Sequence, residues 1–111
     1  MNAKSFLGEF EQMVLLGILQ QGERAFGLEV RREIERSADR RVSRGAFYTT
    51  LDRLARKGYV RWTEETADHG ARAGNLRKFQ VTSAGLEALR DTRRAFDALS
   101  RGLDDVLGEA P

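Results

Sequence analysis

One stretch of the sequence, residues 43–60, constrains the fold more than any other. It begins with Ser43, a favoured helix N-cap because its hydroxyl can accept a hydrogen bond from a free backbone N–H. Near its end stand Lys57 and Gly58, a cation and a glycine of the kinds that close helices. The apolar residues between them recur at helical spacing, and β-branched and aromatic residues follow Gly58. We therefore expect a helix that begins at Ser43, ends at Gly58 and leads directly into a strand.

This expected helix has two chemically different faces. Its apolar face consists of Phe47, Thr50, Leu51 and Leu54. Its opposite face consists of Gly45, Thr49, Asp52 and Arg56, bordered by Tyr48 and Arg53. A short helix that buries one face and shows small polar groups and arginines on the other can enter the major groove of DNA.

Positive charge is concentrated on this helix and its flanks. The chain as a whole carries a net charge of only +2. Between Arg36 and Arg61 there are eight basic and two acidic residues, whereas the tail from Ser83 onward has four basic and six acidic residues. A polyanion would therefore meet positive charge at the helix. A solvated basic surface explains the same charges equally well.

With the helix at about residues 43–57, the chain predicts four helices and two strands. The other helices are expected at about residues 9–20, 27–37 and 83–107. The strands are expected at 59–64 and 76–82, joined by a loop over 66–75. Two consecutive helices with a short connection form a helix-turn-helix, and the hairpin that follows is a wing. We therefore expect a mainly α winged helix-turn-helix domain over residues 1–82, with a C-terminal dimerisation helix over 83–111.

The last expected helix carries a regular apolar stripe. Leu89, Phe96 and Leu103 repeat every seven residues, and so do Thr92, Leu99 and Val106. Such a heptad pattern favours pairing with a second copy of the helix, and packing within the same chain is the alternative. Phe96 could also line a ligand cavity. The residues expected at a dimer interface are Leu89, Phe96, Leu99, Leu103 and Val106.

Ten residues form the candidate DNA-binding set, each with a physical reason. Arginine can fork to guanine or clamp a phosphate, hydroxyl groups suit phosphate oxygens, and a bare glycine lets the backbone approach DNA closely. The set is Ser43, Arg44, Gly45, Tyr48, Thr49, Arg53, Arg56, Arg72, Arg77 and Lys78. Three alternatives stay open: Gly45 permits close helix packing, Tyr48 is half-buried in the core, and Arg53 and Arg56 only solvate the helix end.

The sequence offers no catalytic, metal-binding or membrane-spanning pattern. It contains no cysteine and a single histidine, His69, which is expected to be an ordinary loop residue. No Gly-rich phosphate loop or Ser–His–acid set is present, so an enzyme and a cofactor are not expected. No segment approaches about 18 consecutive apolar residues, so no membrane span is expected and a cytoplasmic protein is the default.

Several separated motifs resemble the PadR family of bacterial transcriptional regulators. The motifs are Leu7–Gln12, Phe26–Val30, Val42–Leu54 with Lys57-Gly58, and Phe79–Gly85. The resemblance covers about residues 5–90, and the motifs fall in the family's order. It implies a homodimeric winged-helix repressor that binds a double-stranded DNA operator and responds to a small aromatic or drug-like effector near the dimer interface. The alternatives are a winged helix used as a protein-interaction module and a small-molecule-binding protein.

Overall fold

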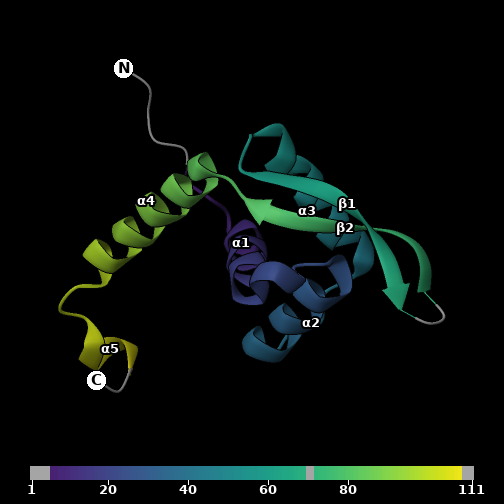
Figure 1. Ribbon diagram of the computed structural model, residues 1–111. Coiled ribbons are helices and arrows are strands. Elements are labelled where there is room, and N and C mark those ends of the chain that lie inside the picture. The colour runs from purple at the N-terminus through teal and green to yellow at the C-terminus, as the bar shows by residue number, and fades with distance from the viewer. Residues whose placement is uncertain (1–5, 70–71, 109–111) are drawn as a thin grey trace.

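The computed structural model describes residues 6–69 and 72–108 of the chain. Its elements follow one another as α1 (Glu9–Gln21), a 3₁₀ turn η1 (Gly22–Arg24), α2 (Gly27–Ala38), α3 (Arg44–Arg56), β1 (Val60–His69), β2 (Arg72–Val81), α4 (Ser83–Ser100) and α5 (Asp104–Leu107). Helices α2 and α3 form the helix-turn-helix, and the two strands form the wing (Figure 1). The predicted mainly α, winged helix-turn-helix fold is therefore confirmed.

The helix boundaries follow from local capping chemistry. The Ser43 hydroxyl accepts a hydrogen bond of 3.1 Å from the Ala46 N–H, as predicted for the start of α3. The Thr82 hydroxyl caps α4 in the same way through the Gly85 N–H, also at 3.1 Å. Gly22, with φ of 55°, ends α1. Gly58, with φ of 80°, follows the last turn of α3 and turns the chain into β1.

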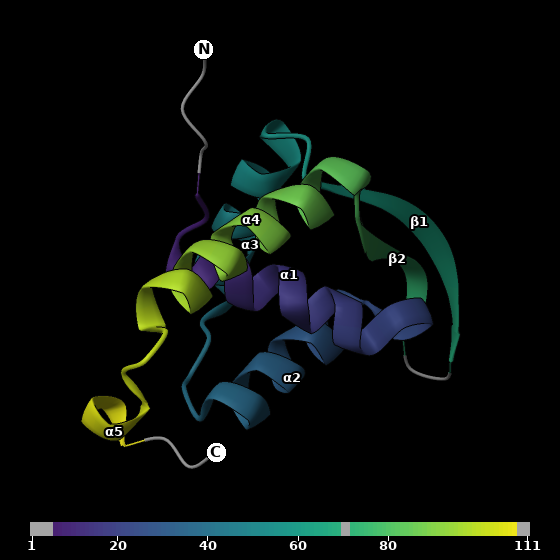
Figure 2. The same cartoon turned by 90° about the vertical axis from the view of Figure 1, so that its left-hand side faces the viewer.

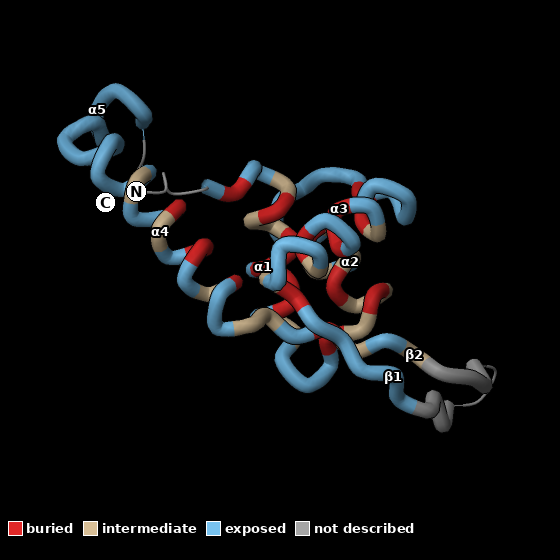
Figure 3. Tube along the Cα trace, turned by 90° about the horizontal axis from the view of Figure 1, so that it is seen from above, coloured by how far each residue is buried: buried red, intermediate tan, exposed pale blue. Residues whose placement is uncertain are grey.

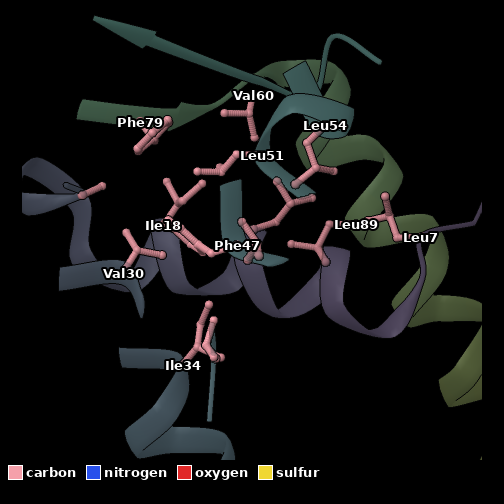
Figure 4. Packing of buried hydrophobic residues seen from close by; sticks show 14 of the residues in the cluster. Leu7, Ile18, Val30, Ile34, Phe47, Leu51, Leu54, Val60, Phe79 and Leu89 are labelled. Atoms are coloured by element: carbon pink, nitrogen blue, oxygen red, sulfur yellow. The ribbon is translucent and has the colours of Figure 1, made fainter. Parts of the chain in front are cut away.

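A single hydrophobic core joins α1, α2, α3, the base of the wing and the first half of α4 (Figure 4). The α3 residues Phe47 and Leu54 are fully buried, and Leu51 is nearly so. Burying each such side chain stabilises the fold by about 1.5–3 kcal/mol relative to leaving it exposed. The predicted apolar face of α3 is therefore the face that fixes this helix to the domain, and the opposite face is left to solvent.

The wing is longer than the sequence suggested. The two strands pair antiparallel from Val60↔Val81 to His69↔Arg72, so the predicted loop over 66–75 is wrong for residues 66–69 and 72–75. Glycine and polar residues are typical of loops, but an antiparallel ladder also accommodates them, and Ala67 pairs with Gly74. The base of the wing is fastened to the 3₁₀ turn, because the Phe79 N–H donates to the Ala25 carbonyl at 2.9 Å.

The last helix is shorter than expected and changes surroundings along its length. It ends at Ser100, and Gly102 with φ of 82° redirects the chain into α5, so the predicted continuous helix to residue 107 is wrong. Leu89 is 4% exposed and packs in the core of its own chain, in contrast to the intermolecular role predicted for it. Thr92 of the predicted stripe is also buried, whereas Phe96, Leu99, Leu103 and Val106 are exposed. The chain from the end of α4 through α5 is accordingly pale blue in Figure 3.

The wing and α4 extend in opposite directions from the helical core (Figure 1), and the molecule measures 52 Å along its longest axis. Helix α4 lies beside α1 (Figure 2), and a hydrogen bond connects α4 to the segment that precedes α1. The buried Thr92 hydroxyl accepts a hydrogen bond of 3.0 Å from the Leu7 N–H and donates one of 2.8 Å to the Ala88 carbonyl. Within residues 6–69 and 72–108, no helix is long and apolar enough to cross a membrane.

Candidate nucleic-acid interface

An open groove of about 760 Å³ lies where the start of α2, the outer face of α3 and the second strand of the wing meet. Its lining mixes cationic, aromatic and small residues from these three parts of the chain. The lining residues are Phe26, Gly27, Leu28, Arg31, Arg44, Gly45, Tyr48, Asp52, Leu76 and Arg77. The groove therefore brings together four of the ten predicted DNA-binding residues, namely Arg44, Gly45, Tyr48 and Arg77.

Gly45 leaves a bare patch in the first turn of α3. A Cβ atom built on this glycine would have no other heavy atom within 4 Å outside its own local helix backbone. Close packing against α2, the alternative reading of this residue, is therefore excluded. Glycine costs about 0.5–1 kcal/mol relative to alanine inside a helix. In the part of the chain that the structure describes, no packing contact compensates for this cost, so the first turn of α3 presents bare backbone to the groove.

Tyr48 is both a core residue and a groove residue. Its ring meets Phe47 edge-on, with centroids 5.2 Å apart and an interplanar angle of 81°. Its hydroxyl end reaches α2, where a Cβ on Gly27 would lie only 2.3 Å from the phenolic oxygen. The guanidinium of Arg44 lies 5.4 Å from the ring centroid. The half-buried ring thus places the polar tip of Tyr48 and the charge of Arg44 at the same groove.

The wing contributes a second aromatic–arginine pair. The Arg77 guanidinium of β2 lies 4.5 Å from the centroid of Trp62 on β1. Both side chains are exposed, and Arg77 lines the groove from β2. An arginine that rests on a ring keeps its N–H groups available to other acceptors while its orientation is restricted. This pair therefore presents directed positive charge opposite α3.

Lys78, the neighbour of Arg77, faces a different environment. Its side chain is 13% exposed, and its Nζ lies 2.5 Å from Glu23 and 3.5 Å from Glu65. The hydrogen bond with Glu23 is the largest cause of a raised Lys78 pKa. The charge of Lys78 is therefore paired within the chain, and its role in DNA binding stays a prediction. The pair with Glu23 fastens the wing to η1.

Acidic residues in the first turn of α1 neutralise two further cations near α3. Glu9 pairs with Arg40 at 3.0 Å, in the turn before α3, and Glu11 pairs with Lys57 at 2.8 Å, at its end. Burial acts to raise the pKa of the Glu11 carboxyl, and it is the largest single influence. The hydrogen bonds from Lys57 and from the Gly8 N–H together outweigh it, so the net effect is a lowered Glu11 pKa. These pairs hold both flanks of α3 and reduce the free charge predicted there.

The arginines of α3 itself are not paired with carboxylates of the described residues, although Arg56 Nε donates a hydrogen bond of 3.5 Å to the Asp52 carbonyl. Arg44, Arg53 and Arg56 are exposed and make no salt bridge with any residue that the structure describes. Arg53, Arg56 and Thr49 stand on the outer side of the helix beyond the groove lining. Ser43 is occupied as the N-cap. The side chains of Arg72 and His69 lie outside the described part of the wing.

Six residues of the groove lining lie outside the predicted set: Phe26, Gly27, Leu28, Arg31, Asp52 and Leu76. Nothing in the periodicity of α2 distinguishes Arg31 from the neighbouring Arg32. The only local signal is that Arg31 stands one helical turn after Gly27 and three residues after Leu28, so all three share one face. These residues meet α3 and the wing only in the folded chain, so the sequence pattern of α2 alone does not predict the contact.

Comparisons with known proteins agree with this architecture. A model of the transcriptional regulator PadR-like family matches residues 15–91. A PadR-like transcriptional regulator from Bacillus cereus is similar in structure, with a TM-score of 0.71, 20% identity and coverage of 91% of this chain and 93% of the other. A PadR family regulator from Clostridium difficile has a TM-score of 0.70 and 14% identity, covering 88% of this chain and 98% of the other. A winged-helix DNA-binding protein from STIV has a TM-score of 0.65 and 20% identity, with the same coverages of 88% and 98%. No curated protein matches the sequence at a significant level.

Proposed function

The chain belongs to the PadR-like family of transcriptional regulators, and we propose that it acts as a homodimer that binds double-stranded DNA through α3 and the wing. The observation that carries this proposal is the outer face of α3. This face combines the bare Gly45 with the free charge of Arg44 at the mouth of a groove that the wing completes. Close backbone approach and a bidentate cation are what a helix needs in the major groove.

The individual residues take separate tasks in this proposal. Arg44, in the first turn of α3, reads a guanine edge or clamps the adjacent phosphate. Thr49 meets base edges or a thymine methyl group, and the Tyr48 hydroxyl and the first-turn N–H groups next to Ser43 suit phosphate oxygens. The remaining backbone contacts are assigned to cations beyond the groove, namely Arg53, Arg56 and Arg72.

The second copy of the chain is expected at the outer half of α4. Phe96 is 58% exposed and Leu99 is 77% exposed, and Leu103 and Val106, beyond the end of the helix, are exposed as well. Two copies joined there would present two α3 helices to DNA, and half-sites about 34–36 Å apart are the geometric expectation. The repressor role, and release by an aromatic or drug-like ligand, remain predictions from the family resemblance.

The substitution Arg44→Ala tests the proposal directly. We expect the operator affinity to fall about 5- to 150-fold, because a bidentate arginine–guanine pair contributes about 1–3 kcal/mol of discrimination. The operator is first located by footprinting the DNA that flanks the gene for this chain. Arg90→Ala is the control. It removes one positive charge, as Arg44→Ala does, but from an exposed position on α4 outside the groove.

Unchanged operator affinity of Arg44→Ala, with an unchanged circular dichroism spectrum, would refute the proposed role of α3. A wild-type protein that binds no DNA would favour the protein-interaction module instead. Light scattering at micromolar concentration tests the homodimer separately, and a monomer there would contradict that part of the proposal.

A further inference from the structure

We propose that Arg31 of α2, outside both the recognition helix and the wing, holds a DNA phosphate in the groove between α2, α3 and β2. This inference rests on the proposed DNA-binding function and adds a contact to it. Arg31 lines the groove together with Arg44 of α3 and Arg77 of β2, so three separate elements each supply one guanidinium. A site built in this way recognises an anion that spans the junction of the elements.

The position of Arg31 follows from the contact between α2 and Tyr48. Gly27, at the start of α2, lies against the Tyr48 hydroxyl, and Arg31 stands one helical turn further along the same face. Arg31 and Arg44 both line the groove beside Tyr48. Arg31 is half-buried and makes no hydrogen bond, ion pair or ring contact with any residue in the described part of the chain.

The charges around the groove favour a phosphate at one end. Three arginines line it against a single carboxylate, that of Asp52. Asp52 stands eight residues after Arg44 on α3, which corresponds to about 12 Å along the helix axis. The carboxylate repels an anion from its own end, whereas the free N–H groups of the first turn of α3 attract one. The phosphate is therefore expected between Arg31, Arg44 and the bare surface of Gly45.

The chemistry of the lining selects a phosphodiester over a peptide partner. Guanidinium groups match the geometry of phosphate oxygens, and the two arginines that rest on Tyr48 and Trp62 have restricted orientations. An apolar partner would leave these cations desolvated without compensation, which is costly. The groove also opens on the face of α3 that carries the proposed base contacts, so a phosphate here belongs to the same DNA duplex.

The test compares Arg31→Ala with Arg32→Ala, a substitution of the adjacent arginine, which is exposed on α2 and does not line the groove. Binding of a labelled operator and of a non-operator duplex is measured by fluorescence anisotropy over a series of salt concentrations. Each neutralised phosphate contributes about 0.9 to the slope of log K against log salt. Arg31→Ala is expected to reduce that slope by about one and to weaken both duplexes equally. Arg31→Lys retains the charge and is expected to retain the slope.

Three outcomes decide the inference. A wild-type slope in Arg31→Ala, in a protein with an unchanged circular dichroism spectrum, would overturn it and leave the proposed function standing. An equal loss of slope in Arg32→Ala would also overturn it, because general charge rather than the groove would then be responsible. Absence of DNA binding by the wild-type protein would overturn the proposed function itself, and the Arg31 contact with it.

Discussion

Replacing Gly45 with alanine is expected to stabilise the protein while weakening its binding to DNA. The new methyl group would meet nothing within 4 Å, so it introduces no clash in the free protein. Alanine in a helix is favoured over glycine by about 0.5–1 kcal/mol. For a domain of this size that corresponds to a rise in melting temperature of about 2–8 °C.

The same methyl group stands where DNA would approach α3 most closely. Forcing a methyl group into a close-packed contact costs about 1–3 kcal/mol. The expected result is a fall in operator affinity of about 5- to 150-fold, since 1.4 kcal/mol corresponds to a factor of ten. Thermal melting followed by circular dichroism measures the first effect, and anisotropy titration of the operator measures the second.

Gly85→Ala is the matched control for the stability measurement. A Cβ at Gly85 would lie 2.3 Å from the Tyr59 carbonyl oxygen and 2.9 Å from Val81, so this substitution is expected to destabilise the fold by more than about 1 kcal/mol. A Gly45→Ala protein with unchanged or tighter DNA binding would refute the reasoning that the bare face exists for DNA. A less stable Gly45→Ala protein would show that the residue packs within the chain.

Three further outcomes are expected. Thr92→Val leaves the buried Leu7 N–H without its acceptor and is expected to cost about 1–3 kcal/mol in denaturant unfolding, whereas Thr92→Ser should retain most of the stability. The Glu11 pKa is lower in the folded state, so its pair with Lys57 stabilises the protein above pH 4.5. This stability is lost as the pH falls through the folded-state pKa, and Glu11→Gln should lose stability at pH 7 and flatten this acid dependence. Replacing the exposed Leu99 with serine should weaken self-association in light scattering without lowering the melting temperature. An unchanged free energy of denaturant unfolding for Thr92→Val would contradict the first expectation. An unaltered acid profile for Glu11→Gln would contradict the second, and an unchanged dimer for Leu99→Ser the third.

The sequence predicted α3 and its cap because both depend on neighbours along the chain. Ser43 caps the N–H three residues later, and the apolar spacing of Phe47, Leu51 and Leu54 determines which face is buried. These signals are local, so helical periodicity is enough to read them. The burial of one face also determined correctly which residues stand on the other.

The errors arose where tertiary contacts outweigh local pattern. The heptad stripe suggested a continuous last helix, but Gly102 redirects the chain and Leu89 finds its partners in its own core. The pairing of Lys78 is another tertiary contact that no local pattern indicates, because its partner Glu23 stands more than 50 residues earlier. Arg31 could not be distinguished from other arginines of α2 until the wing and α3 were placed beside it.

The fastening of the wing at its base has a mechanical consequence. The Lys78–Glu23 pair and the Phe79–Ala25 hydrogen bond clamp β2 at one end, whereas the two strands continue toward Arg72 as a two-stranded ladder, with no third strand in the described structure. A beam clamped at one end deflects least near the clamp, and its deflection grows with distance. Arg77 stands next to the clamp, so its place opposite α3 is set by the core of the domain. Any bending of the wing to follow the shape of DNA would therefore change the reach of its far end and leave the width of the groove nearly constant.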